Sequence, residues 1–437
     1  MTPPVLVVAA AGQVDAGDTA WMLMATALVL MMTPALGLFY AGLVRGKNTL
    51  NTFMMCVAAL AVATVMWALV GYSIAFGEGN AIIGGLDHAF LRDVGFGPRE
   101  GTTIPHLLFM AFQATFCILT VALVSGAVVE RMRFGPYLLF AALWSVLVYA
   151  VLAHWAFGGG WLQSLGTLDF AGGVAVEMGS GFSALAAALV VGARKDYGRQ
   201  ALLPHNAVYV LLGAGLLWFG WFGFNGGSGF STGNAGVLAF TNTLLCPAAT
   251  LCVWFALDLI RGRQVTAIGA ATAIIVGCVG ITPAGGYISP GSALLLGAIA
   301  AVPSYAIIVW RPRTRVDETL DVLAAHGVAG LTGILFVGFF AQELWNGVGD
   351  GLLYGNAAQL GWQALAAVAT PLYAFVVTFV LLRVIGLLMP LRATEREEAL
   401  GMDVVQHGEE AYATGEGAIL ITPEDGIRAP VPVADPG

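Results

Sequence analysis

The chain has 437 residues, of which 58% are hydrophobic and only 10% are charged, and its formal net charge is −8. Water-soluble domains carry about 25% charged residues, so this composition excludes an ordinary soluble protein and predicts an integral membrane protein. Much of the acidic charge lies in the first long loop and in the C-terminal segment, where we expect it to keep these segments in water.

The apolar segments predict eleven membrane-spanning helices. A helix needs about 20 apolar residues to cross the hydrocarbon core of a bilayer. The eighth candidate is the weakest, because it is short and rich in glycine. In chain order the candidates are 19–44, 52–76, 105–129, 135–157, 173–192, 206–225, 237–260, 265–282, 291–310, 322–341 and 362–389.

The basic residues indicate the orientation of these spans. Cytoplasmic loops are enriched in Lys and Arg. The loops after spans 1, 3, 5, 7 and 9 each carry at least two basic residues, whereas those after spans 4, 6, 8 and 10 carry none. The loop after span 2 carries Arg92 and Arg99 together with four acidic residues. This alternation predicts that the N-terminus lies outside and the C-terminus inside.

Three parts of the chain follow from this assignment. Residues 1–18 form an outer N-terminal segment or the remnant of a signal peptide. A secretory signal normally has basic residues before its apolar stretch, and this segment has none, so the sequence does not decide whether it is cleaved. Residues 19–389 form the transmembrane domain. Residues 390–437 form a cytoplasmic tail, in which "GAILITP" is either a short strand or a docking element.

The eleven predicted spans can be divided into two groups of five and one final span. This division permits an inverted repeat followed by a long C-terminal helix. Such repeats commonly meet around a site near the middle of the membrane. The likeness between Leu168-Asp169 and Leu320-Asp321, each near a span start, is weak. An inverted repeat would bring span 5 against span 10, so their polar residues would converge.

Two of these polar residues are ionisable groups inside spans. Glu177 lies in span 5 and His326 in span 10. A charge at the bilayer centre costs at least about 2.5–3.5 kcal/mol, so such groups usually face a cavity or a partner. The alternatives are a carboxyl group kept protonated by burial and a histidine that only joins two helices by a hydrogen bond.

Three further features allow both a structural and a functional interpretation. Asp169 could cap span 5 or favour a cation nearby. The "GWFGFNGGS" segment could simply end span 6, or expose the Ser228 hydroxyl to a ligand. Phe112 and Phe116, four residues apart on one helical face, and Phe157 before "GGG" could be packing residues or rings that attract an ammonium-like cation.

The five cysteines all fall in apolar runs without metal-ligand spacing, so we expect small buried hydrophobic residues and neither a metal site nor a disulfide framework. The chain also lacks the HExxH and G-x-S-x-G patterns, which argues against an intramembrane hydrolase or another enzyme.

In chain order, several motifs together resemble the Amt/Mep/Rh ammonium transporter family, most closely its bacterial Amt branch. The resemblance extends from about Asp18 to Tyr412 and is carried by "LGLFYAGLVRGKN", "GYSIAFGEGN", "AFQATFCILTVALVSGAVVERMRF", "AHWAFGGG", "LDFAGG", "GWFGFNGGS", "ITPAGGYI", "AAHGVAG" and "EREEALGMDVVQHGEEAY". It implies a homotrimer of eleven-span protomers, each with its own narrow hydrophobic pore, an outer ammonium vestibule, a gate of two phenylalanines and two pore histidines.

The resemblance also assigns roles to positions. It places Phe116 and Phe224 in the gate, Phe112 beside the vestibule and Ser228 as its hydroxyl acceptor. It makes Asp169 the buried aspartate that supports cation recruitment and His326 the second pore histidine.

Two positions depart from the family pattern. Glu177 replaces the first pore histidine, as in a subset of the family that includes some fungal members, and Phe157 replaces the vestibule tryptophan. Phenylalanine keeps a ring face but has a weaker cation–π surface, so we expect weaker ammonium binding in the vestibule.

These features predict electrogenic ammonium uptake across the cytoplasmic membrane. Ammonium would be deprotonated, ammonia would cross the apolar pore, and Glu177 and His326 would relay the proton. No cofactor and no nucleic acid are expected; methylammonium is a possible second substrate, and the resemblance implies a PII-type signalling protein on the cytoplasmic face. The alternatives are a passive channel for ammonia or carbon dioxide, and an ammonium sensor that acts through a cytoplasmic partner.

Overall fold

The computed structural model describes residues 13–412, and within this range it consists of helices with no strand beyond two isolated bridging pairs. Ten of these helices are long and apolar enough to cross a membrane. An eleventh apolar helix, α11, has 15 residues and corresponds to the weakest predicted span. The prediction of an all-helical membrane protein is confirmed, and the count of eleven spans is consistent with the structure.

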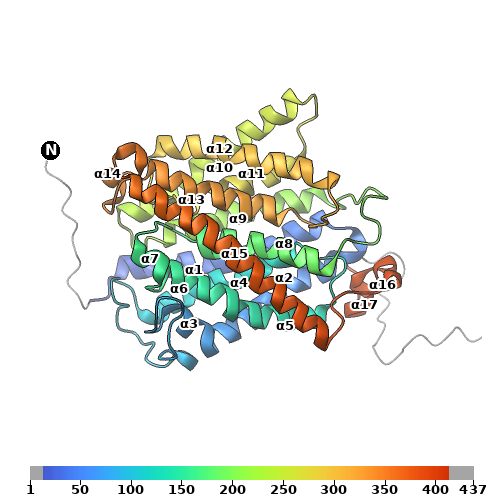
Figure 1. Cartoon of the computed structure of the whole chain (residues 1–437), viewed down its shortest axis with the longest axis horizontal. Helices are drawn as coiled ribbons and strands as arrows, with labels where there is room; N and C mark the ends of the chain where they lie inside the picture. The colour runs from blue at the N-terminus through green and yellow to red at the C-terminus, as the bar shows by residue number, and fades with distance from the viewer. Residues whose placement is uncertain (1–12, 413–437) are drawn as a thin grey trace, which may run out of the picture.

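The long helices run side by side, and the small helices α16 and α17 lie at one end of them, here named the tail end (Figure 1). α7 and α14 lie at the opposite end. The first half contains α1 (Ala16–Leu43), α2 (Thr49–Met66), α3 (Tyr72–Phe76), α4 (His106–Ser125), α5 (Phe134–Trp144), α6 (Val151–Phe157), α7 (Trp161–Leu165) and α8 (Gly179–Val191).

The second half contains α9 (Ala207–Gly227), α10 (Asn234–Ile260), α11 (Ala267–Ile281), α12 (Pro290–Trp310), α13 (Ala329–Phe340), α14 (Glu343–Asn346), α15 (Ala357–Leu388), α16 (Glu395–Leu400) and α17 (Met402–His407). Four π-helical stretches continue or open these helices: η2 (Trp67–Gly71), η4 (Ser145–Ala150), η5 (Gly173–Met178) and η7 (Leu323–Val328). Short 3₁₀ turns lie at Gly46–Asn48, Ala89–Leu91, Arg311–Arg313 and Leu352–Tyr354.

Two predicted boundaries are wrong by several residues: span 11 was expected to start at residue 362, but α15 begins at Ala357, and the end of span 3 is also misplaced. Span 3 was expected to reach residue 129, but α4 ends at Ser125. The fully buried Arg131 explains the early end, because its guanidinium donates to the carbonyl oxygens of Ala127 (2.9 Å) and Asp317 (2.6 Å). A helix that continued past Ser125 would pair the Ala127 carbonyl with a backbone N–H or move it away from the guanidinium group.

The expectation that all five cysteines are buried holds for four of them, whereas Cys252 is exposed on α10. An apolar sequence places a residue in a span but does not say which side of the helix faces lipid. The N-terminal residues 1–12 and the "GAILITP" segment lie outside the described residues.

Buried ion pairs hold the loops together at the tail end. Arg194 donates to Glu130 (2.6 Å) and to Asp317 (2.8 Å), and Arg45 donates to Glu130 (3.0 Å). Burial alone would raise the pKa of Glu130, but the charges of Arg194 and Arg45 outweigh it and the pKa is lowered. The loops after α1, α4, α8 and α12 therefore form one connected layer.

The chain after α15 packs against this layer. The Asp403 carboxylate accepts the backbone N–H groups of Leu50 (3.0 Å) and Asn51 (2.7 Å), at the start of α2. The Glu398 carboxylate accepts the backbone N–H of Lys195 (3.0 Å). An acidic side chain at a helix start satisfies N–H groups that lack partners within the helix, so these contacts fix α16 and α17 in place.

Candidate functional site

One face of α4 borders two separate spaces in the protein. Phe109, Gln113 and Phe116 line a cavity of about 650 Å³ toward the end opposite the tail, here named the outer cavity. Leu119 and Leu123, further along the same helix, line a much smaller space of about 10 Å³, here named the chamber. Residues three and four apart share a helical face, so a single stripe of α4 follows the path from one space to the other.

The outer cavity is rich in aromatic side chains. Phe116, Phe157, Asp169 and Ser228, all predicted site residues, line it. Phe112 does not line it: it is fully buried behind the wall, with its ring centroid 4.8 Å from that of Phe116. The structure therefore places Phe112 beside the cavity and the other four residues at its surface.

The Ser228 hydroxyl is arranged as an acceptor. The Ser228 O–H donates to the backbone carbonyl of Phe224, one turn earlier in α9, with 2.8 Å between the two oxygens. A hydroxyl group has one proton and two lone pairs, so this bond uses the proton and leaves oxygen lone pairs for a donor in the cavity. The helix-ending interpretation also holds, because α9 stops at Gly227.

Asp169 both caps a helix and borders the cavity. Its carboxylate accepts the backbone N–H groups of Gly172 (3.0 Å), Gly173 (2.7 Å) and Val174 (2.8 Å), at the start of η5. The side chain is buried but lies in the cavity wall. The capping and cation-favouring interpretations are therefore compatible, because a carboxylate held by N–H groups still contributes negative charge to the cavity.

Two phenylalanine rings separate the outer cavity from the chamber. The rings of Phe116 and Phe224 lie 4.2 Å apart between centroids, with 34° between their planes. Phe224 in turn contacts Trp221, which lines the chamber, at 5.7 Å. The two rings are therefore in contact at a tilt, between the residues that line the outer cavity and those that line the chamber.

Glu177 and His326 meet in the chamber. The Glu177 Oε2 and His326 Nδ1 atoms lie 2.8 Å apart, and both side chains are buried. The other carboxylate oxygen of Glu177, Oε1, has no hydrogen-bond partner within residues 13–412. The rest of the chamber is lined by Leu36, Phe39, Leu119, Leu123, Val176, Leu217, Trp221 and Ile275.

The pair forms because the two helix starts cross at glycines. A Cβ on Gly181 would lie 2.2 Å from the Gly327 nitrogen, and a Cβ on Gly330 would lie 2.6 Å from the Glu177 Cβ. Gly181 and Gly330 are 149 residues apart, as Glu177 and His326 are, and a Cβ on Gly181 would also lie 3.3 Å from the carbonyl carbon of His326. Both acid–base residues also lie in π-helical turns, η5 and η7, which frequently occur at functional sites.

The same shift corrects the weak Leu-Asp likeness. Asp169 lies 8 residues before Glu177, and the residue 8 before His326 is Glu318 rather than Asp321. Glu318 is buried and accepts the backbone N–H of Leu323 (3.1 Å) at the start of η7, as Asp169 does at η5. Asp321 instead pairs with Arg311 at 2.7 Å.

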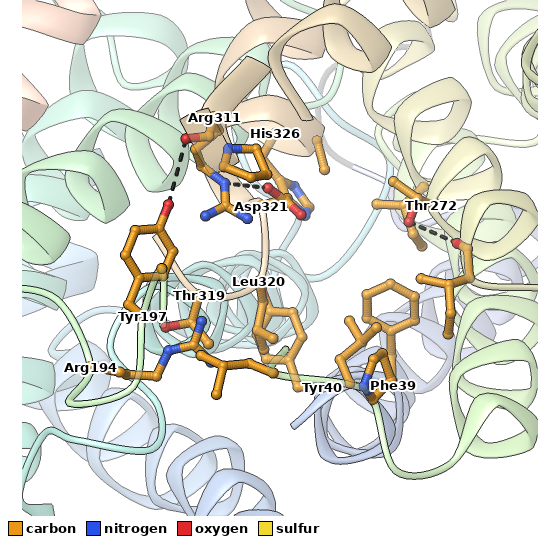
Figure 2. A pocket seen from close by; sticks show the side chains of 18 of the residues that line it. Phe39, Tyr40, Arg194, Tyr197, Thr272, Arg311, Thr319, Leu320, Asp321 and His326 are labelled. Carbon is orange, nitrogen blue, oxygen red and sulfur yellow. Dashed lines mark hydrogen bonds and ion pairs between the residues drawn. The ribbon is translucent and has the colours of Figure 1, made fainter. Parts of the chain in front are cut away.

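His326 also opens onto a second cavity at the tail end. This inner cavity, of about 390 Å³, is lined by His326 together with Arg194, Tyr197, Arg311 and Asp321 (Figure 2). In Figure 2 the Arg311–Asp321 ion pair lies beside His326. The outer cavity, the phenylalanine pair, the chamber and the inner cavity therefore follow one another, with His326 shared by the last two.

Sequence reasoning missed several residues of this path. Phe230 and Arg99 line the outer cavity, and Trp221 lines the chamber, where its indole N–H donates to the Thr282 hydroxyl at 3.0 Å. Phe230 has a φ of 51°, a left-handed backbone conformation that is uncommon for residues other than glycine. A phenylalanine at this position gives no sign of such a turn in the sequence. In the part of the chain that the structure describes, no group of three or more His, Cys, Asp or Glu could hold a metal ion.

Comparisons with known proteins point to one family. A family model described as Ammonium Transporter Family matches residues 20–412. The chain is 46% identical over 399 residues to a Bacillus subtilis protein named "Ammonium transporter", covering 91% of this chain and 98% of that one. The Candida albicans Mep2 crystal structure superposes with a TM-score of 0.84 at 35% identity, over 88% of both chains. A structure titled "Sensor Amt Protein" superposes with a TM-score of 0.83 at 28% identity, over 90% of this chain and 98% of that one.

Proposed function

The chain belongs to the ammonium transporter family, and from this premise we propose that it carries ammonium into the cell by separating it into ammonia and a proton. Ammonium would enter the outer cavity and lose its proton, and ammonia would pass Phe116 and Phe224. The proton would be relayed by Glu177 and His326. The observation that carries this proposal is the 2.8 Å contact between these two side chains in an apolar chamber.

Moving a charged ammonium ion through the apolar chamber is costly, which argues for separating the proton from ammonia. The chamber is small and lined mainly by apolar side chains, so an ammonium ion would lose its hydration without gaining equivalent partners. Neutral ammonia avoids most of this cost. The separated proton still needs acid–base groups, and Glu177 and His326 are the titratable residues that line the chamber.

The pair can take up and release one proton, so its charge alternates between −1 and zero. With Glu177 ionised, His326 donates Nδ1–H to Oε2 and keeps a lone pair on Nε2. When Nε2 takes up a second proton and the Nδ1 proton moves to Oε2, the carboxyl O–H donates to Nδ1 and the ring proton lies on Nε2. The second arrangement holds one proton more than the first, and because both groups share this change, the titration belongs to the pair rather than to either residue.

The outer cavity would recruit ammonium by three kinds of contact. The rings of Phe116 and Phe157 offer faces to a cation, the Ser228 oxygen offers lone pairs, and Asp169 adds negative charge behind the wall. Following the loop charges, the outer cavity faces outside and the tail end lies in the cytoplasm. We further propose a homotrimer in the cytoplasmic membrane with a PII-type regulator on the tail end.

A current recording tests the proposed function. Purified protein in proteoliposomes, adsorbed on a solid-supported membrane, should give a transient current on an ammonium pulse, a smaller or equal one on methylammonium, and none on potassium. Ammonia flux without current would instead favour a passive channel. Binding of ammonium without flux would favour a sensor, an alternative supported here only by the similarity to the "Sensor Amt Protein" structure.

The Phe157 position gives a separate prediction. Phe157→Trp should lower the half-saturating ammonium concentration, because indole is a better cation–π surface and Phe157 is a half-buried residue at the cavity surface. An effect of about 0.5–1 kcal/mol corresponds to roughly two- to fivefold. Current amplitude against ammonium concentration measures it, and Phe112→Trp, behind the wall, should not give the same gain.

A further inference from the structure

Arg99 lies in the wall of the outer cavity, where its positive charge is unexpected. It lines this cavity together with Phe109 and Asp169, and it also lines a neighbouring cavity of about 800 Å³ formed largely by the loop after α3. Its guanidinium carbon lies 5.6 Å from the centroid of the Phe109 ring, a cation–π distance. A permanent cation therefore already occupies aromatic surface beside the proposed ammonium site.

The backbone around Arg99 is fixed by hydrogen bonds. The Arg99 N–H donates to the Ile104 carbonyl at 3.0 Å, which closes a short turn before α4. On the same turn, the Thr103 carbonyl accepts the N–H of Asp15 at 2.8 Å, and the Thr103 hydroxyl donates to the Asp18 carboxylate. The start of α1 therefore holds the turn against the rim of the cavity, so the position of Arg99 is set by the fold.

The charge of Arg99 is not neutralised by direct contact. Within residues 13–412 no carboxylate forms an ion pair with it, in contrast to Arg194 and Arg311. The side chain is half-buried, so part of its field reaches the cavity rather than bulk water. Glu100 also lines both cavities and reduces this field without pairing with the guanidinium group.

We propose that Arg99 sets the ammonium affinity of the outer cavity by electrostatic repulsion and by occupying the Phe109 ring face. The proposal rests on the proposed function, because it takes the outer cavity as the ammonium entry site. Two unit charges about 7 Å apart in water repel enough to change occupancy roughly threefold. The repulsion acts on every monovalent cation alike, so it changes apparent affinity without changing the preference for ammonium over potassium.

The test compares Arg99→Gln with the wild-type protein in proteoliposomes. Half-saturating ammonium concentrations are measured at ionic strengths of about 0.01 M and about 1 M, set with choline chloride, where the screening length is about 30 Å and about 3 Å. At low ionic strength Arg99→Gln should need roughly threefold less ammonium for half-saturation, and the difference should shrink at high ionic strength. Maximal flux and potassium exclusion should stay unchanged. Arg99→Lys, which keeps the charge, should remain within about twofold of the wild type.

Arg92→Gln is the matched control. Arg92 lies in the same loop and is exposed, but it does not line the outer cavity, so its removal changes the net charge by the same amount without the proposed effect. An equal shift in both variants, or an unchanged half-saturation in Arg99→Gln beside normal wild-type flux, would overturn this inference alone. A wild-type protein that moves no ammonium would overturn the proposed function together with it.

Discussion

Replacing Glu177 by glutamine is expected to remove most of the ammonium-driven current, by about a hundredfold, which is the usual contribution of a positioned acid–base group. The amide has nearly the shape of the carboxyl group and can still bond to His326 across 2.8 Å, so the chamber should keep its structure. It cannot take up or release a proton near neutral pH. The chamber, at about 10 Å³, has little room for a chain of water molecules that could replace the relay.

Glu177→His is the informative control for this prediction. An imidazole at this position restores a titratable group, and it produces the two-histidine pattern that the family resemblance led us to expect. We expect a measurable current with a shifted pH dependence. Thermal unfolding in detergent should show that both variants are folded. A Glu177→Gln protein with wild-type current and wild-type pH dependence would contradict the relay.

The transmembrane organisation could be predicted because it depends on local composition. Apolar length predicted the spans, including the short eighth span that corresponds to α11. The orientation indicated by the basic loops stays a prediction. Spacing of four on one helical face also predicted the contact between Phe112 and Phe116, whose rings are 4.8 Å apart. Each of these properties is set by residues close together in the chain.

Features that depend on distant residues were harder to predict. The Glu177–His326 contact joins positions 149 apart, and it could be proposed only from an assumed inverted repeat or from the family resemblance. The repeat itself was misaligned at Asp321, because Asp169 and its counterpart Glu318 share a capping role but not a residue type. The place of Arg99 in the wall of the outer cavity was not predicted either, because the sequence of a charged loop does not indicate which cavity its side chains line.

The π-helical turns connect the fold to the proposed chemistry. Such a turn inserts one extra residue into the helix, which rotates the residues before it relative to those after it. In η5 and η7 the turns carry Glu177 and His326, while Gly181 and Gly330, in the regular helices that follow, let the two helices come together. We infer that the chain uses close glycine packing to set the distance between the two acid–base groups.

Gly330→Ala should therefore impair transport through geometry alone. The added Cβ would lie 2.6 Å from the Glu177 Cβ, where ordinary contacts begin at 3.4 Å, so the helices must separate or Glu177 must move. Misplacing reacting groups by about 1 Å can cost about a hundredfold in rate, and overpacking costs about 1–3 kcal/mol in stability. We expect at least a tenfold loss of current, measured on the same proteoliposomes, with a lowered unfolding temperature. Gly215→Ala is the matched control, because a Cβ there meets no atom within 4 Å and alanine favours the helix. If Gly330→Ala and Gly215→Ala transport equally well, the distance between Glu177 and His326 is not set by this glycine contact.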